Sequence, residues 1–235
     1  MVERLPGGDS REGGVPYFAY VFFTAKLSPE AFAWLVPLHN GHTRVGVMCA
    51  QDARGALRQF LDRLIPHWRE RQDIHLRSKP IAQTPLRRTF TERVLVIGEM
   101  AGQVKTTTGG GIYYGLLAAR LAAETVNAAF VAGCFSAEQL SVYERAWKSL
   151  LADELTLGLS FRKCYGWLGD WQMHVLLRSI SRNGLKDAIR RKADFDWHGK
   201  LIIELGERLP LIRRRCFPVV DAAFGGSLKG CQELG

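Results

Sequence analysis

The residues best suited to chemistry lie between Val94 and Glu124, in the sequence VLVIGEMAGQVKTTTGGGIYYGLLAARLAAE. Gly109, Gly110 and Gly111 follow three threonines and precede an apolar segment. Glycines let a ligand approach the backbone, and the first N–H groups of a helix have no partner within it. Together with the positive end of the helix dipole, such a loop favours an electron-rich ligand. A tight turn without a ligand is the alternative.

The elements that would position this loop follow from the spacing of apolar residues. Val94-Leu95-Val96-Ile97 is short and β-branched, which predicts a buried strand that ends at Gly98. After the loop, apolar side chains recur at helical intervals. The recurring positions are Ile112, Leu116, Ala119 and Ala123, with Leu117 and Leu121 alongside. The unit is therefore predicted to be a strand, a glycine-rich loop and a helix.

Two parts of this stretch carry a family resemblance. Gly98-Glu99-Met100-Ala101-Gly102 and Thr107-Thr108-Gly109-Gly110-Gly111-Ile112 resemble the second FAD-binding motif of the geranylgeranyl reductase family, in the flavoprotein group that includes p-hydroxybenzoate hydroxylase. The motif of that family is Gly-Asp-Ala-Ala-Gly, seven residues, then Gly-Gly-Ile. Glu99 stands where the family has Asp, and Thr106 stands where Pro is common.

This resemblance implies FAD as the cofactor. It gives Glu99 the role of binding the ribityl chain, and it places Gly111 and Ile112 at the N1/O2 edge of the flavin ring. A reduced flavin carries negative charge near N1, which helix N–H groups stabilise. The predicted cofactor-binding residues are Gly98, Glu99, Gly102, Thr108, Gly109, Gly110, Gly111 and Ile112.

Aromatic and β-branched runs near the start predict an antiparallel sheet. The predicted strands are Tyr17 to Thr24, Phe32 to Leu38 and Thr43 to Cys49, with a hairpin turn at Asn40-Gly41. The family carries the motif Tyr-x-Trp-x-Phe-Pro in its substrate domain, followed after seven or eight residues by Gly-x-Gly. The similar residues here are Phe32, Trp34, Val36 and Pro37, then Gly46 with Met48 in place of the last glycine.

The resemblance implies that this sheet lines a pocket for a long isoprenoid chain. Positions 32, 34 and 36 of a strand point to one face, so Phe32, Trp34 and Val36 are predicted to form an apolar wall, with Pro37 as a further substrate-binding residue. An ordinary strand core is the alternative, and it is the preferred one for Phe32 or Val36 taken alone.

The remaining patterns predict mainly helices. Asp52 to Ile65 and a segment from Ser136 to about Cys164 are expected to be helical, and Ile74 to Ile81 is expected to be a strand. From Trp167 onward, tryptophans lie among basic residues, which fits an interfacial membrane contact or an ordinary solvated face. The residues concerned are Trp167, Trp171, Trp197, Arg178, Arg182, Lys186, Arg190, Arg191, Lys192 and Arg213 to Arg215.

The predicted fold class is α+β, with a partial α/β FAD-binding fold. Four regions are expected: a disordered tail (1–16), a substrate-binding antiparallel sheet with one helix (17–85), the C-terminal half of an FAD-binding domain (86–165), and a basic helical region (166–235). The second region contributes the substrate wall, and the third contributes the strand, glycine-rich loop and helix.

Composition limits the function classes. The 235 residues carry a net charge of +9, and 47% are hydrophobic. The longest apolar stretch, Gly115 to Val131, is broken by Arg120 and Glu124, so no membrane-spanning helix is predicted. Five scattered cysteines indicate reduced thiols in a cytoplasmic setting, and no metal-ligand cluster is evident. Charge alone, without a recognition motif, does not support nucleic-acid binding.

Flavoproteins of this group bind the ADP part of FAD with an N-terminal Gly-x-Gly-x-x-Gly unit, and no such motif follows a strand here. The resemblance covers roughly residues 17–165 and corresponds to the second half of the family. The chain is therefore expected to be a fragment that needs a separate N-terminal FAD-domain chain.

Three functional hypotheses result. The first is an FAD-dependent oxidoreductase that reduces C=C bonds of isoprenoid chains on lipids or chlorophyll precursors. The second is a flavin monooxygenase or halogenase, and the third is a non-enzymatic lipid- or membrane-binding remnant. Tyr113 and Tyr114 are candidates for a proton donor or for packing. The expected location is the cytoplasm, with peripheral contact to a membrane surface as a further hypothesis.

Overall fold

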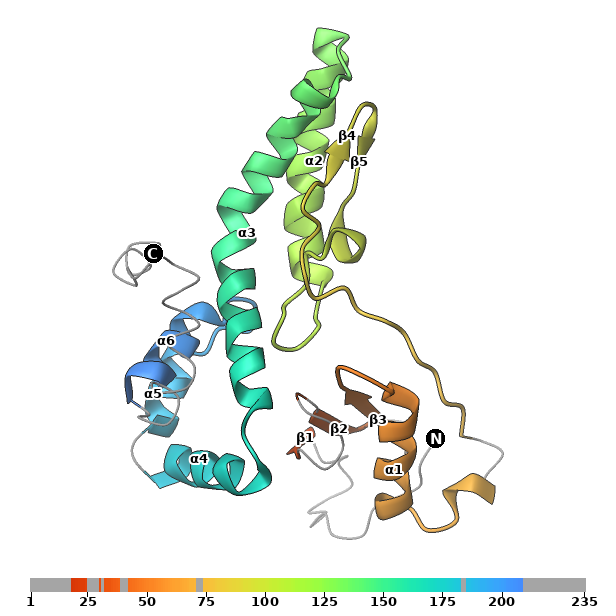
Figure 1. Ribbon diagram of the computed structural model, residues 1–235, viewed down its shortest axis with the longest axis vertical. Helices are drawn as coiled ribbons and strands as arrows, with labels where there is room; N and C mark the ends of the chain where they lie inside the picture. The colour runs from red at the N-terminus through yellow and green to blue at the C-terminus, as the bar shows by residue number, and fades with distance from the viewer. Residues whose placement is uncertain are drawn as a thin grey trace. The chain divides into compact units, whose positions relative to one another are not determined.

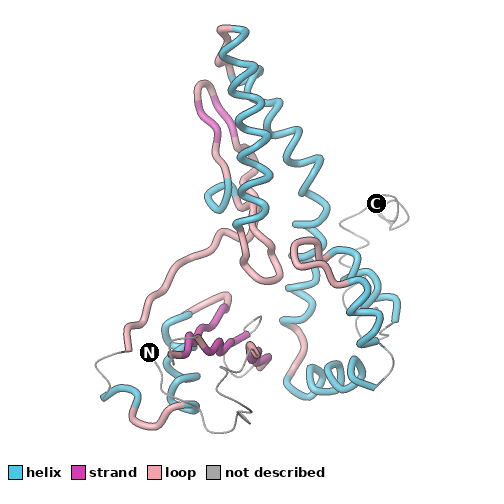
Figure 2. Tube along the Cα trace, turned by 180° about the vertical axis from the view of Figure 1, so that it is seen from behind, coloured by secondary structure: helices cyan, strands magenta, loops and turns pink. Residues whose placement is uncertain are grey.

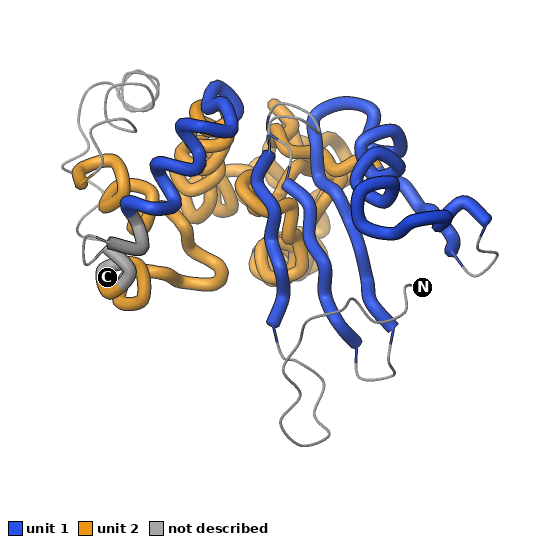
Figure 3. Tube along the Cα trace, turned by 90° about the horizontal axis from the view of Figure 1, so that it is seen from below, with its two compact units in different colours: residues 1–79, 166–181 blue, residues 80–165, 182–235 orange. Residues whose placement is uncertain are grey.

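The computed structural model describes residues 18–24, 30, 32–38, 42–70, 74–182 and 185–208. The chain forms two compact units, one of residues 1–79 and 166–181 and the other of residues 80–165 and 182–235 (Figure 3). The four regions predicted from the sequence are a finer, functional division and stay a prediction. The tail predicted at 1–16 lies outside the described residues. The mixture of helices with small antiparallel sheets agrees with the α+β class.

The first unit is built on a three-stranded antiparallel sheet (Figure 1). Its strands, in spatial order, are β1 (Tyr20–Phe23), β2 (Phe32–Pro37) and β3 (Thr43–Met48). In this register Trp34 lies opposite Val21 on one side and Gly46 on the other. The predicted strands are therefore confirmed. The turn predicted at Asn40-Gly41 lies outside the described residues.

Helix α1 (Ala53–Leu64) covers one face of this sheet. The side chain of Asp52 accepts the N–H of Gly55 at 2.9 Å and so caps the helix. The rings of Phe60 and Phe22 meet edge to face at 5.3 Å between centroids. Phe22 lies opposite Ala33, so α1 packs on the face that buries Ala33 and Leu35. Phe32, Trp34 and Val36 are left on the other face.

The first unit also contains a 3₁₀ helix, η1 (Trp68–Glu70), and helix α4 (Asp170–Arg182). The prediction of a strand at Ile74 to Ile81 was wrong, because no β ladder includes these residues. The apolar residues in this segment alternate with polar ones as in a strand, but Pro80 has no N–H to donate to a ladder.

The second unit is built on two long helices, α2 (Ile112–Ala132) and α3 (Ala137–Gly166), which lie side by side (Figures 1 and 2). Gly133, at φ 60°, ends α2, and the hydroxyl of Ser136 accepts the N–H of Gln139 at the start of α3. The buried residues shared by the two helices form the main core: Tyr114, Ala118, Ala122, Tyr143, Trp147, Leu151 and Leu155. Both predicted helices are confirmed.

The buried face of α2 differs from the apolar stripe seen in the sequence. The residues that face inward are Tyr114, Ala118, Ala122, Thr125 and Ala129. Ile112 and Leu116 of the predicted stripe are instead 85% and 65% exposed. Alanines let a helix approach the large aromatic side chains of its partner closely, so the small residues are the ones that are buried.

The strand before the glycine-rich loop is shorter and more exposed than predicted. β5 (Val94–Leu95) pairs with β4 (Phe90–Thr91), and Val94 and Ile97 remain 47% and 37% exposed. The prediction of a buried strand was therefore wrong. Within the described residues β4 is its sole ladder partner. The unit is completed by η2 (Gly98–Ala101), α5 (Leu185–Lys192) and α6 (Gly199–Arg208).

Helix α2 is also long and apolar enough to cross a membrane, by length and composition alone, and 22% of the relevant window is buried within the described structure. No membrane-spanning helix was predicted from the sequence, because Arg120 and Glu124 interrupt the apolar stretch, so the finding differs from that expectation. One such helix is weak evidence for a membrane span, because core helices of soluble proteins pass the same test. Here Ala118 and Ala122 are packed in the core shared with α3.

Candidate functional site

The turn that follows β5 is shaped by two glycines with positive φ. Gly98 has φ 70° and begins η2, and Gly102 has φ 72° and ends it. The N–H of Gly102 donates to the carbonyl of Glu99 at 3.0 Å. A Cβ at Gly102 would lie 2.4 Å from the carbonyl oxygen of Thr84. Gly102 is therefore needed for close backbone packing, whereas Glu99 is half-buried on the same turn.

A buried glutamine fixes this turn to α3. The Oε1 of Gln103 accepts the N–H of Gly98 at 2.6 Å, and its Nε2 donates to the hydroxyl of Tyr143 at 2.8 Å. That hydroxyl donates in turn to the carbonyl of Val96 at 3.1 Å. Gln103 is fully buried, so each of its polar atoms needs such a partner. The turn that carries Glu99 is thereby held by a core residue of α3.

The glycine-rich loop closes on itself before α2 begins. The N–H of Lys105 donates to the carbonyl of Gly110 at 2.8 Å, and the N–H of Gly109 donates to the carbonyl of Lys105 at 2.7 Å. Gly109 has φ 74°, a conformation that other residues rarely adopt. Gly111 is the N-cap of α2 and supplies no side chain to cap it. Thr108 and Ile112 are exposed beside this helix end.

These residues fit an electron-rich cofactor edge. The predicted binding residues fall on two neighbouring elements, η2 and the start of α2, which are in contact. A Cβ on Gly115 would lie 3.8 Å from the Cα of Gly98, so the two elements meet at ordinary van der Waals distance. The first N–H groups of α2 have no partner inside the helix, and no capping side chain covers them. The predicted residues are thus brought together, while their contact with a flavin stays a prediction.

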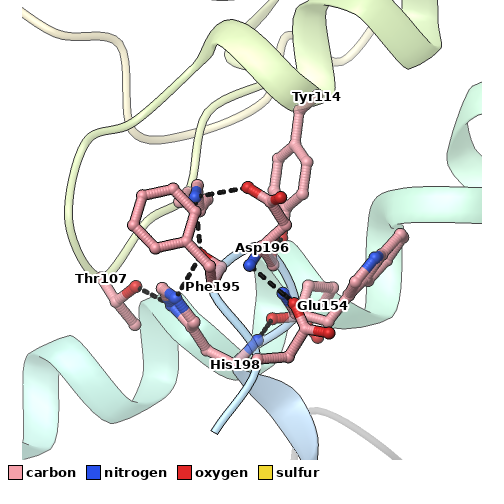
Figure 4. A network of polar contacts seen from close by, with 9 residues as sticks. Thr107, Tyr114, Glu154, Phe195, Asp196 and His198 are labelled. Carbon is pink, nitrogen blue, oxygen red and sulfur yellow. Dashed lines mark hydrogen bonds and ion pairs between the residues drawn. The ribbon is translucent and has the colours of Figure 1, made fainter.

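A second group of residues, far away in the sequence, reaches the same loop (Figure 4). The Nζ of Lys105 lies 2.7 Å from Oδ1 of Asp196 and 2.7 Å from the carbonyl oxygen of Phe195. The hydroxyl of Thr107 lies 2.5 Å from Nδ1 of His198. Sequence reasoning missed these residues, because no local motif marks contacts across some ninety positions.

The tautomer of His198 follows from its partners. Its Nε2 lies 3.2 Å from the carbonyl oxygen of Phe195, which can only accept a hydrogen bond. In the neutral ring Nε2 therefore carries the proton, and Nδ1 accepts from the hydroxyl of Thr107. Burial, with a smaller effect of the Lys105 ammonium, lowers the pKa of His198. The neutral ring is thus the form that this site favours.

The two tyrosines after the loop are engaged in packing and hydrogen bonding. The hydroxyl of Tyr114 donates to the carbonyl oxygen of Asp196 at 2.7 Å, and burial raises the pKa of Tyr114. The ring of Tyr113 meets the ring of Trp197 edge to face at 6.1 Å. The hollow between Lys105, Tyr114 and the residues around His198 is too small to hold a water molecule. The structure therefore supports the packing role for both tyrosines.

In the first unit, three of the four predicted substrate residues lie on one face of β2, as expected from its alternation. Phe32, Trp34 and Val36 are half-buried, whereas the intervening Ala33 and Leu35 are buried. Pro37, the last residue of the strand, is also half-buried. The rings of Phe32 and Trp34 lie 5.7 Å apart.

Gly46 explains how the indole of Trp34 is accommodated. A Cβ at Gly46 would lie 2.1 Å from Cζ2 of Trp34, so the indole lies directly over the glycine of the opposite strand. Val36 follows on the same face of β2 and lies opposite Arg44 of β3. Whether this face binds substrate stays a prediction.

Comparison with known proteins shows a similarity to geranylgeranyl reductases. The chain is 32% identical over 168 residues to digeranylgeranylglycerophospholipid reductase 2 of Methanothermobacter thermautotrophicus, which covers 70% of this chain and 43% of that protein. Over about 70% of its length, the chain is similar to a protein of the geranylgeranyl reductase family. An uncharacterized protein of Methanocaldococcus jannaschii is 27% identical over 199 residues, or 83% of this chain and 50% of that protein. No family model matches.

The fold gives an independent likeness to the geranylgeranyl reductases. The solved structure of a geranylgeranyl bacteriochlorophyll reductase-like protein from Thermoplasma acidophilum covers 92% of this chain with a TM-score of 0.67, at 16% identity. At that identity the likeness concerns the fold. This chain covers 52% of that structure and about half or less of the curated relatives.

Proposed function

We propose that this chain is part of an FAD-dependent oxidoreductase that reduces C=C bonds of isoprenoid chains on lipids or chlorophyll precursors. The observation that carries the proposal is the 32% identity to a protein named digeranylgeranylglycerophospholipid reductase 2. The glycine-rich loop at the start of α2 supports it with a geometry suited to an electron-rich cofactor. The reductase name of this relative favours the proposal over the monooxygenase or halogenase alternative.

In this proposal the cofactor edge rests on η2 and α2. Glu99 binds the ribityl chain, and the backbone at Gly111 and Ile112 faces the ring edge. When bound and reduced, FAD supplies a hydride equivalent. The chain contributes the free N–H groups of the helix end and a loop without side chains, which together favour negative charge at that edge. Gly98, Gly102, Gly109 and Gly110 shape the backbone, and Thr108 stands exposed beside it.

The isoprenoid chain is proposed to lie along the half-buried face of β2. Phe32, Trp34 and Val36 present apolar side chains there, the indole of Trp34 lies over Gly46, and Pro37 ends the strand next to Val36. Apolar contact of this kind binds a hydrocarbon chain in proportion to the area removed from water.

The ADP part of FAD is bound in this group of flavoproteins by a Gly-x-Gly-x-x-Gly motif, and no such motif follows a strand in these 235 residues. We therefore include a second polypeptide segment with a dinucleotide-binding fold, on a separate chain or the same one, as a partner. Exposed apolar side chains from β5 through η2, and on α2, offer it a surface to cover. They are Val94, Ile97, Met100, Ile112, Leu116, Phe130 and Val131.

The proposal also includes a cytoplasmic location with peripheral contact at a membrane, where isoprenoid lipids reside. Trp167, just before α4, and Trp171, in its first turn, are 55% and 75% exposed, and Arg178 on α4 is exposed. Trp197 is excluded from this surface because it packs on Tyr113 and Tyr114. Co-sedimentation with anionic vesicles at low salt and release at high salt is expected. No retention at low salt would remove the membrane contact from the proposal.

The decisive experiment is the visible absorption spectrum of the purified chain before and after addition of FAD. A protein-bound flavin band at about 450 nm is expected. Reduction of a geranylgeranyl lipid is then measured with dithionite as the electron donor. A protein that stays colourless with excess FAD, both alone and with a dinucleotide-binding partner segment, would refute the flavin function.

A further inference from the structure

The segment Asp194 to Gly199 lies between α5 and α6, and it contacts the glycine-rich loop, the first turn of α2, and α3. We propose that this segment is a clamp that fixes the glycine-rich loop in the geometry that receives the cofactor, with Asp196 as the central positioning residue. The inference deepens the proposed FAD function and rests on it.

The strongest contact of the clamp is a buried ion pair. The side chain of Lys105 is 7% exposed and that of Asp196 is 26% exposed, with 2.7 Å between Nζ and Oδ1. The same Nζ lies 4.2 Å from the centre of the Phe195 ring. A buried ammonium needs such partners, because removing one of them leaves an uncompensated charge. Asp196 therefore determines where the side chain of Lys105 can rest.

The position of Lys105 is transmitted to the glycines by its backbone and by its side chain. Its N–H and its carbonyl both bond to the loop, at Gly110 and Gly109. Its side chain runs beneath Gly110, where a Cβ would lie 3.2 Å from Cε of Lys105. A displaced Lys105 would therefore displace the residues that lead into the N-cap at Gly111. Three glycines have no side chains with which to hold themselves in place.

Two further contacts extend the clamp to both ends of the loop. The carbonyl of Asp196 accepts the hydroxyl of Tyr114 in the first turn of α2. On the other side, the ring of His198 pairs with the hydroxyl of Thr107. The loop is thus held before, beneath and after its glycines by residues of one short segment.

The clamp is itself rigidly held. The Oδ1 of Asp194 accepts the N–H groups of Asp196 and Trp197 at 2.7 and 3.0 Å. On α3, the carboxylate of Glu154 accepts the N–H groups of His198 and Gly199 at 2.6 and 3.0 Å. A local turn and a core helix therefore both fix the backbone of the clamp. Preorganisation of this kind matters at a site whose donors must meet a cofactor within hydrogen-bonding distance.

The test compares Asp196→Asn with Glu144→Gln in the full chain. Glu144 on α3 also pairs with a lysine, Lys148, at 2.8 Å, but it has no contact with the loop. If Asp196→Asn lowers the population of the competent loop to about one tenth, the apparent dissociation constant for FAD rises about tenfold. A change in the shape of the bound flavin band is expected as well. Glu144→Gln should leave both unchanged.

A second measurement does not depend on FAD. Hydrogen exchange of the ligand-free proteins is followed at residues 106–112, where Asp196→Asn should speed exchange about tenfold. Tyr114→Phe, which removes a single hydroxyl, should have a smaller effect in the same residues and serves if Asp196→Asn does not fold. Equal exchange in parent, Asp196→Asn and Tyr114→Phe would overturn the clamp. Absence of FAD binding to every protein, with faster exchange in Asp196→Asn, would count against the proposed function alone.

Discussion

The contact between the glycine-rich loop and α3 at Gly158 makes a quantitative prediction about stability. A Cβ at Gly158 would lie 2.4 Å from Oγ1 of Thr106 and 3.4 Å from Cγ2 of Thr107. Thr106 is 2% exposed, and its hydroxyl donates to the carbonyl of Leu155 at 3.2 Å. Gly158→Ala therefore forces either the loop to move or the hydroxyl to rotate away from its acceptor.

The magnitude follows from three opposing effects. Alanine in place of glycine inside a helix stabilises it by about 1 kcal/mol. Loss of the hydrogen bond from Thr106 costs about 1 kcal/mol, and crowding of the buried loop costs about 1–3 kcal/mol. Gly158→Ala is thus expected to lower the free energy of unfolding by about 1–3 kcal/mol, and each kcal/mol lowers the melting temperature by about 2–4 °C.

Gly115→Ala is the matched control. Its Cβ would lie 3.8 Å from the Cα of Gly98, an ordinary contact, so only the gain in helix propensity is expected. Thr106→Ala is the rescue, because it removes Oγ1 and leaves the Cβ of Thr106 3.7 Å from the new methyl group at Gly158. The double variant should be more stable than Gly158→Ala, with a coupling of about 2–4 kcal/mol, because the crowding is relieved and the hydrogen bond of Thr106 is lost only once.

The assay is reversible urea unfolding followed by far-ultraviolet circular dichroism. Free energies of unfolding are compared only between variants whose unfolding free energy depends equally steeply on urea concentration. If Gly158→Ala were as stable as Gly115→Ala, the close approach of the loop to α3 would be wrong. Additive effects of the Gly158 and Thr106 substitutions would lead to the same conclusion.

Three other substitutions have defined outcomes. Gly111→Asp places a Cβ 2.9 Å from Cγ1 of Val104 and adds negative charge, so stabilisation by FAD in thermal unfolding should disappear, and the site is wrong if it persists. Trp34→Ala should weaken binding of a geranylgeranyl chain but not of FAD, and unchanged lipid binding would contradict the wall on β2. The pKa of His198 lies below its ordinary 6.5, so stability is complete above about pH 6.5 and is lost as the pH falls through the lower folded pKa. In His198→Gln, the urea midpoint of unfolding should fall less than in the parent between about pH 7 and 5. Burial raises the pKa of Glu154, which stabilises the protein as the pH falls, in the parent and in His198→Gln alike. If the urea midpoints of the two proteins changed equally with pH, His198 would not be the cause of the acid loss.

Local patterns in the sequence predicted the elements well. The hairpin of β2 and β3 and the cap of α1 at Asp52 depend on residues close together in the chain, as does the end of α2 at Gly133. Alternation along β2 also predicted that Phe32 and Trp34 share a face. Such features follow from residue types and periodicity, because neighbours in sequence determine them.

Burial was harder to predict, because it depends on what an element packs against. Ile112 and Leu116 are the large apolar residues of α2, yet alanines occupy the face that meets α3. Val94 has the composition of a buried strand residue and is half exposed, since β4 is its only ladder partner within the described residues. Residue type indicates a preference for burial, whereas the partner surface decides which residues are buried.

The glycine-rich motif illustrates why a site can be recognised in a sequence before it can be understood. Glycines give the loop access to a ligand, but the same freedom makes ordering it entropically costly. Something else must therefore restrict the loop, and here that restriction comes from Lys105 and Thr107 on one side and Tyr114 on the other. All three are held by one segment about eighty to ninety residues further along the chain. A loop motif of this kind is consequently half of a site, and the residues that fix its geometry have to be sought in three dimensions.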